Sequence, residues 1–71
     1  MPAYLSRAEA AEYLTTRGLR ITKNTLQKMA TTGGGPLYRV FGVRAIYETP
    51  HLDAWAFEKM GEPRHSTSEA A

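Results

Sequence analysis

The side chains that could do chemistry in this sequence are concentrated first in residues 21–30. Two are amides, Asn24 and Gln27, and two are amines, Lys23 and Lys28. Helical spacing places all four on one outward face. Asn and Gln can form paired hydrogen bonds with adenine, and Lys can contact guanine or phosphate. The segment is therefore a candidate contact to nucleic acid, and the alternative is an ordinary solvated helix face.

Arginines dominate the next segment, residues 37–48. Arg39 and Arg44 stand on either side of Gly42-Val43, a pair that suits the centre of a tight hairpin turn. In that hairpin both arginines lie on the outward face, where they could contact phosphate or the minor groove. The alternative is that their aliphatic stems cover neighbouring apolar side chains.

Five further residues complete the candidate contacts to DNA. These are Ser6, Arg7, Arg20, Thr22 and Thr25. Ser6 and Arg7 stand at the start of the first predicted helix. Backbone amides there, together with the Arg7 guanidinium, could bind a phosphate. Helix capping explains Ser6 equally well, and both roles are compatible.

Capping signals predict two helices that could hold these side chains. Ser6 and Glu9 have the spacing of a capping box, so a helix should begin there and end at Gly18. Thr22 is suited to cap a second helix. The run Thr32-Gly33-Gly34-Gly35-Pro36 cannot continue that helix. This run follows a helix and lacks the Lys-Ser/Thr of a P-loop, so a phosphate-cradling loop is disfavoured.

The hairpin register follows from a two-residue turn at Gly42-Val43. It places one apolar or aromatic set on the face toward the core, consisting of Tyr38, Val40, Ala45 and Tyr47. The opposite face pairs Phe41 with Arg44, Arg39 with Ile46, and Leu37 with Glu48. A slip of one residue would mix the two sets, so the register is well specified.

A last helix is predicted after the hairpin, with Thr49 as its cap and Pro50 at its first position. Its buried stripe should hold Leu52, Trp55, Ala56 and Met60, with Trp55 as the largest contributor to the core. Gly61 should end it. We expect a mainly α fold with a small β-hairpin over residues 1–61, followed by a disordered polar tail over residues 62–71.

Composition limits what so small a chain can do. With 71 residues it forms one domain with little room for an enclosed catalytic cleft. It has no cysteine, no apolar run long enough to span a bilayer and no visible secretion signal. The two histidines, His51 and His65, are isolated, and no nucleophile–base or carboxylate pair is evident. We expect neither an enzyme nor a metal or other cofactor.

Charge is distributed unevenly along the chain. Residues 1–49 hold seven basic and three acidic side chains, a net charge of +4, whereas residues 50–71 carry −2. The positive charge coincides with the predicted second helix and hairpin. This asymmetry suits a polyanionic partner, and ordinary surface charge is the alternative.

Taken together, these elements resemble the MerR-like winged helix-turn-helix of the excisionase and AlpA group. The matching segments are residues 4–14, Thr25-Leu26, residues 35–40, Ile46-Tyr47 and residues 52–55. They cover about residues 4–60. Two features depart from the pattern: the turn over residues 15–22 is longer, and the tip Phe41-Gly42-Val43 is less basic.

The resemblance implies a helix-turn-helix, a two-stranded wing and a C-terminal helix that bind double-stranded DNA sequence-specifically. It further implies an excisionase, or recombination directionality factor, that bends attachment-site DNA and acts with a tyrosine-type integrase. An AlpA-like transcriptional regulator is the alternative that the same surface allows. Either protein would be cytoplasmic and associated with the nucleoid.

The outward hairpin face also suggests contact between protein molecules. Leu37, Phe41 and Ile46 would form an exposed apolar patch there. We hypothesise head-to-tail self-association on DNA through this patch. The alternatives are that the tail or Leu19 covers the patch, or that the protein is an interaction module that binds no nucleic acid.

Overall fold

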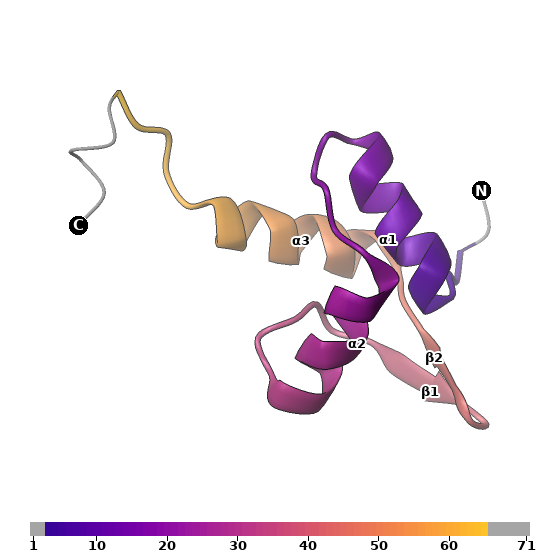
Figure 1. The fold of residues 1–71 in the computed structure, drawn as a ribbon. Coiled ribbons are helices and arrows are strands. Elements are labelled where there is room, and N and C mark those ends of the chain that lie inside the picture. Colours follow the sequence, from indigo (N-terminus) through magenta and orange to yellow (C-terminus); the bar gives the residue numbers. More distant parts are fainter. Residues whose placement is uncertain (1–2, 66–71) are drawn as a thin grey trace.

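The computed structural model describes residues 3–65, which form three helices and a two-stranded antiparallel hairpin. In chain order these are α1 (Arg7–Thr16), α2 (Lys23–Thr32), β1 (Arg39–Phe41), β2 (Arg44–Ile46) and α3 (Thr49–Met60). Figure 1 shows α1 beside α3 in the upper part of the molecule, while α2 and the hairpin extend below it as two neighbouring arms. The fold is mainly helical and compatible with a winged helix-turn-helix.

Helix α1 begins with the capping box that its sequence predicts. The Ser6 hydroxyl accepts a hydrogen bond from the Glu9 amide at 3.1 Å, and the Ser6 amide donates to Glu9 Oε1 at 2.8 Å. These two bonds satisfy donors that a helix start would otherwise leave unpaired. The helix ends before Gly18, whose φ of +89° is a conformation that favours glycine.

Helix α2 is capped as predicted, but it includes Thr32, which the sequence assigned to the run that ends it. The Thr22 hydroxyl accepts from the Thr25 amide at 3.1 Å. The helix continues to Thr32, where the Thr31 and Thr32 hydroxyls donate to backbone carbonyls four residues earlier. These bonds tie both threonines to the last turn of the helix. The helix ends at Gly33, whose φ is +95°.

The predicted hairpin register is confirmed, with Val40 opposite Ala45 and Phe41 opposite Arg44. The prediction that one whole face covers the core is wrong in part. Tyr47 is buried, but Val40 is 64% exposed. The reason is that only the base of the hairpin meets the body, where Leu5 and Tyr47 exchange backbone hydrogen bonds of 2.8 and 2.7 Å. The tip projects beyond the helices (Figure 1).

Helix α3 differs from its prediction at its start. Glu48, not Thr49, is the N-cap residue, and no side chain makes a capping hydrogen bond. Pro50 is therefore the second residue of the helix rather than the first, but it still lies in the first turn, where its missing amide needs no partner. The helix ends at Gly61, as predicted.

The buried stripe of α3 is shorter than predicted. Leu52 and Ala56 are buried, but Trp55 is only half-buried and Met60 is exposed. Trp55 is drawn toward the glycine run, where its indole Nε1 donates to the Gly34 carbonyl at 2.9 Å. Met60 is exposed because the end of α3 extends past the rest of the body (Figure 1).

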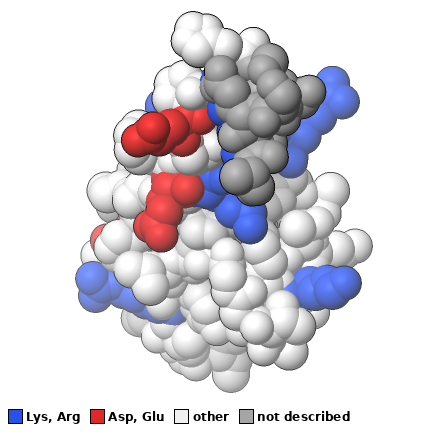
Figure 2. Space-filling view, turned by 90° about the vertical axis from the view of Figure 1, so that its left-hand side faces the viewer, with Lys and Arg blue, Asp and Glu red and all other residues white. Residues whose placement is uncertain are grey.

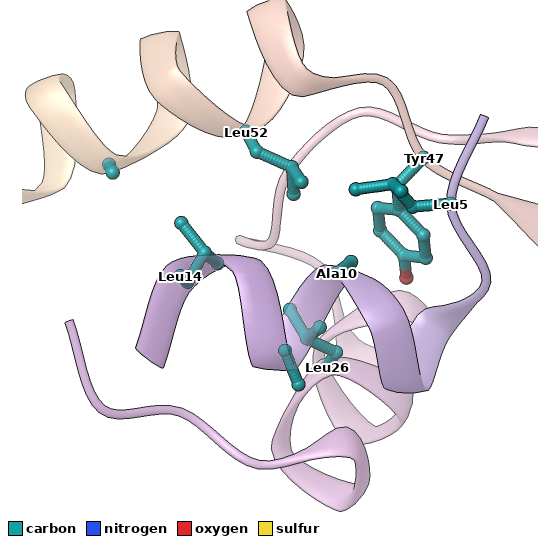
Figure 3. Close-up of a cluster of buried hydrophobic side chains, with 8 residues drawn as sticks. Leu5, Ala10, Leu14, Leu26, Tyr47 and Leu52 are labelled. Carbon is teal, nitrogen blue, oxygen red and sulfur yellow. The ribbon is translucent and has the colours of Figure 1, made fainter. Parts of the chain in front are cut away.

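The core lies where the three helices and the hairpin base meet (Figure 3). Its largest fully buried side chain is Tyr47, not Trp55. Ala10 and Ala11 are buried with it, and their small size lets neighbouring helices approach α1 closely. The complete set of buried apolar residues is Leu5, Ala10, Ala11, Leu14, Leu26, Tyr47, Leu52 and Ala56.

Beyond α3 the chain is described only as far as residue 65. Residues 62–65 are exposed and non-helical, and the rest of the predicted tail lies outside the described residues. No helix within residues 3–65 is long and apolar enough to cross a membrane.

Candidate nucleic-acid interface

The outer face of α2 presents the four polar side chains that its sequence predicts. Lys23, Asn24, Gln27 and Lys28 are all exposed. Within residues 3–65 none of the four makes a side-chain hydrogen bond or an ion pair. Leu26 holds the opposite face of the helix in the core, at 1% exposure. The donors and acceptors on the outer face are therefore free for a ligand.

The two threonines at the start of α2 are already engaged with each other. The Thr22 and Thr25 hydroxyl oxygens lie 2.9 Å apart, and Thr22 also caps the helix. Both side chains remain exposed. Their first role is to define where α2 begins, and hence which side chains face outward.

The two hairpin arginines differ in their surroundings. Arg39 Nε lies 2.6 Å from Glu48 Oε1 and forms an ion pair with it. Arg44 is exposed and has no ion pair within the described part of the chain. The same Glu48 oxygen lies 3.9 Å from His51 Nδ1, a buried atom without a hydrogen bond. Arg44 is thus the freer cation, whereas the charge of Arg39 is partly balanced.

Arg7 has a more defined position than the sequence suggests. Its Nε donates to the Tyr47 hydroxyl at 3.1 Å, and its guanidinium lies 5.7 and 5.9 Å from the ring centroids of Tyr38 and Tyr47. The two rings are 5.6 Å apart. This cation–π arrangement joins the start of α1 to the hairpin base. The sequence predicted that Tyr38 and Tyr47 share one face of the hairpin. It did not predict that Arg7 contacts them, because Arg7 lies 40 residues before Tyr47 in the chain.

Ser6 and Arg20 contribute differently from the residues above. The Ser6 hydroxyl and amide are both used in the capping box. Arg20 is exposed and lines a hollow with Leu19, Trp55 and Met60. That hollow adjoins the second half of α3 rather than the hairpin, so Arg20 is set apart from Arg39 and Arg44.

The space between α2 and the hairpin is a shallow, mostly apolar hollow. It shows that the two elements are neighbours at their bases, although they diverge toward their ends (Figure 1). Its lining comes from α2, the glycine run and the hairpin base, through Leu26, Met29, Ala30, residues 33–37, Tyr38 and Tyr47.

Helix α2 itself contains no acidic side chain. On the face shown in Figure 2, the lower third carries Lys or Arg on both flanks and no acidic side chain, while most acidic side chains lie higher. Asp53 on α3 is held by the Tyr13 hydroxyl at 2.8 Å and by Arg17 Nη1 at 3.7 Å. The side of α2 is therefore favourable for an anionic partner, whereas at the hairpin base Glu48 partly balances Arg39.

The predicted self-association patch is only partly formed. Leu37 and Phe41 are exposed, but Ile46 is half-buried, so the prediction of three exposed apolar residues is wrong for Ile46. Ile46 lies nearer the hairpin base than Phe41 does, directly opposite Arg39 in the ladder. Leu19, predicted as one possible cover for the patch, packs against the core instead.

No family model matches this sequence, and no curated protein matches it.

Proposed function

We propose that this protein binds double-stranded DNA as a winged helix-turn-helix. Helices α1 and α2 would form the helix-turn-helix, with α2 in the major groove, and the β1–β2 hairpin would be the wing. The observation that supports this most strongly is the exposed, unpaired outer face of α2. A face with two amides and two amines matches the hydrogen-bonding edges of base pairs and the adjacent phosphates.

The side chains divide by chemistry into two roles in this proposal. Asn24 and Gln27 read base edges, because a planar amide can donate and accept at once. Lys23 and Lys28 contact phosphate or guanine. Phosphate contacts fix the register of the protein on the duplex, whereas the amides give the sequence preference.

The hairpin arginines add contacts beside the helix site. Arg44 is free to reach the backbone, and Arg39 keeps its terminal nitrogens available although its Nε faces Glu48. Arg7 is held by two tyrosines, so its guanidinium loses less freedom when it meets a phosphate. The candidate contacts therefore come from α1, α2 and the hairpin.

We further propose that the biological role is that of a recombination directionality factor. The likeness of residues 4–60 to the excisionase group supports this role, with a tyrosine-type integrase as partner. Footprinting across neighbouring genomic DNA tests it. Protection of repeated sites beside an integrase attachment core is the expected result, and protection of one promoter would instead indicate an AlpA-like regulator.

DNA binding itself is tested by a double substitution on α2. Lys23→Ala with Lys28→Ala should weaken duplex binding and reduce the slope of log affinity against log salt by about 1.8, since each lost phosphate contact removes about 0.9. The measurement is fluorescence anisotropy with a labelled duplex over a range of salt concentrations. Lys59→Ala with Arg64→Ala is the control, because it removes the same charge from another part of the surface.

Equal loss of affinity in both double variants would attribute binding to net charge alone and contradict the assignment to α2. Binding that does not depend on salt would contradict the phosphate contacts. Absence of any duplex binding by the unmodified protein would favour an interaction module that acts only on proteins.

A further inference from the structure

The tip of the hairpin is more apolar than a solvent-exposed turn requires. Phe41 is 76% exposed, and Val43 is 100% exposed. Neither residue belongs to the core cluster, and Val40 is largely exposed beside them. Burial of these side chains against a partner would be favourable, because their apolar surface is almost wholly in water.

Basic side chains flank this apolar tip on both strands. Arg44 is directly opposite Phe41 in the ladder, and Arg39 precedes Phe41 by two residues on the same strand. Gly42 at the turn adopts a φ of +68° and has no side chain, so the end of the hairpin is narrow. Residues 38–47 contain no carboxylate, and the acidic side chain that pairs with Arg39, Glu48, lies at the hairpin base. The tip is therefore an apolar point between two cations.

We propose that this tip acts as a wedge in the minor groove of the DNA, where Phe41 partly unstacks a base step and kinks the duplex. The inference rests on the DNA binding proposed above and specifies what the wing does there. Proteins that kink DNA from the minor groove insert apolar side chains of this kind between bases, and arginines occupy the groove beside them. Base faces match Phe41, and the phosphates on either side match Arg39 and Arg44.

A duplex fits this surface better than a protein partner does. Figure 1 shows α2 and the hairpin extending on the same side of the molecule, so DNA held by α2 lies next to the tip. A protein partner would have to supply carboxylates for two arginines around an apolar centre. In a duplex, phosphates line both edges of the minor groove on every sequence, and the apolar faces of the bases lie between them.

The wedge also predicts where on the site the tip acts. Pyrimidine–purine steps such as TA and CA unstack most easily, so the kink should fall on one of them. Replacing that step by a stiffer one should weaken binding, although α2 does not contact it. This would be specificity by deformability rather than by base hydrogen bonds.

The test compares two phenylalanines that are equally exposed. Phe41 and Phe57 are both 76% exposed, but Phe57 is on α3. The protein is mixed with duplexes that carry end fluorophores to report bending and 2-aminopurine to report unstacking. Phe41→Ala should abolish the 2-aminopurine signal, reduce the bend and weaken binding about tenfold. Phe57→Ala should change none of these.

Retention of bend and unstacking in Phe41→Ala would overturn the wedge, as would an equal effect of Phe57→Ala. Sedimentation of both variants without DNA addresses a second copy of the chain as the occupant. If Phe41→Ala dissociates an oligomer and leaves the kink intact, the tip is a self-association surface and the wedge is wrong. Failure of the unmodified protein to bind any duplex would refute the proposed function itself. The wedge is tested separately by the variant with Lys23→Ala and Lys28→Ala, which should bind weakly yet still kink the DNA that it binds.

Discussion

The ion pair between Arg39 and Glu48 should limit how strongly the hairpin contacts DNA in the proposed function. Glu48 Oε1 lies 2.6 Å from Arg39 Nε, so a phosphate must compete with a carboxylate for this arginine. Glu48→Gln keeps the shape of the side chain and removes its charge. It removes no helix cap, because the Glu48 side chain makes no capping hydrogen bond. We therefore expect the variant to bind duplex more tightly.

The expected size of the effect follows from the exposure of the pair. The Arg39 side chain is 66% exposed and the Glu48 side chain 23% exposed, so solvent screens their attraction, and the pair stabilises the fold by about 0.2–1 kcal/mol. Freeing one cation for phosphate should steepen the slope of log affinity against log salt by about 0.9. The ratio of the affinity of Glu48→Gln to that of the unmodified protein should therefore fall by about 3.5-fold between about 50 and about 200 mM salt.

The assay is fluorescence anisotropy of both proteins over this salt range, with thermal unfolding as a check on the fold. Glu12→Gln is the matched control, since Glu12 is an exposed α1 carboxylate without an ion pair in the described residues. A slope that is equal for Glu48→Gln and Glu12→Gln would mean that only net charge matters. An unchanged or weaker affinity for Glu48→Gln would refute the competition between Glu48 and phosphate.

Two further predictions concern the stability of the fold. Leu14→Ala should lower the free energy of unfolding by about 3 kcal/mol, because Leu14 is fully buried. Leu37→Ala, at a 69% exposed position, should change it by less than about 0.5 kcal/mol. Urea denaturation measures both free energies, and similar values for the two variants would contradict the assignment of the core. Tyr47→Phe should cost about 1 kcal/mol, since it removes the acceptor of the Arg7 hydrogen bond. Tyr38→Phe is the control, because the Tyr38 hydroxyl has no hydrogen bond within residues 3–65, and a cost as large as that of Tyr47→Phe would count against this role for the bond.

Local signals in the sequence were sufficient for much of the secondary structure. The capping box at Ser6, the cap at Thr22 and the turn at Gly42 each involve residues only a few positions apart. Because such interactions depend on neighbours in the chain, sequence alone can identify them. The exposed face of α2 was predictable for the same reason, since helical periodicity separates it from Leu26.

Other features depended on contacts between distant parts of the chain. Periodicity indicated that Trp55 faces inward, but not that its indole would bond to the Gly34 carbonyl and stay half-buried. The alternation of the hairpin indicated which side chains share a face, but not that the tip projects too far for Val40 to reach the core. The depth of burial depends on how long each element is relative to the body that it packs against.

The sequence by itself therefore determined where helices and turns begin, which register the hairpin adopts and which polar side chains α2 turns outward. Only the tertiary structure decided that Arg7 lies against Tyr38 and Tyr47, that the Trp55 indole bonds to the Gly34 carbonyl, and that the apolar tip stands clear of the core. The physical reason is range: capping and turn bonds join residues close in sequence, whereas these contacts require elements far apart in the chain to pack together.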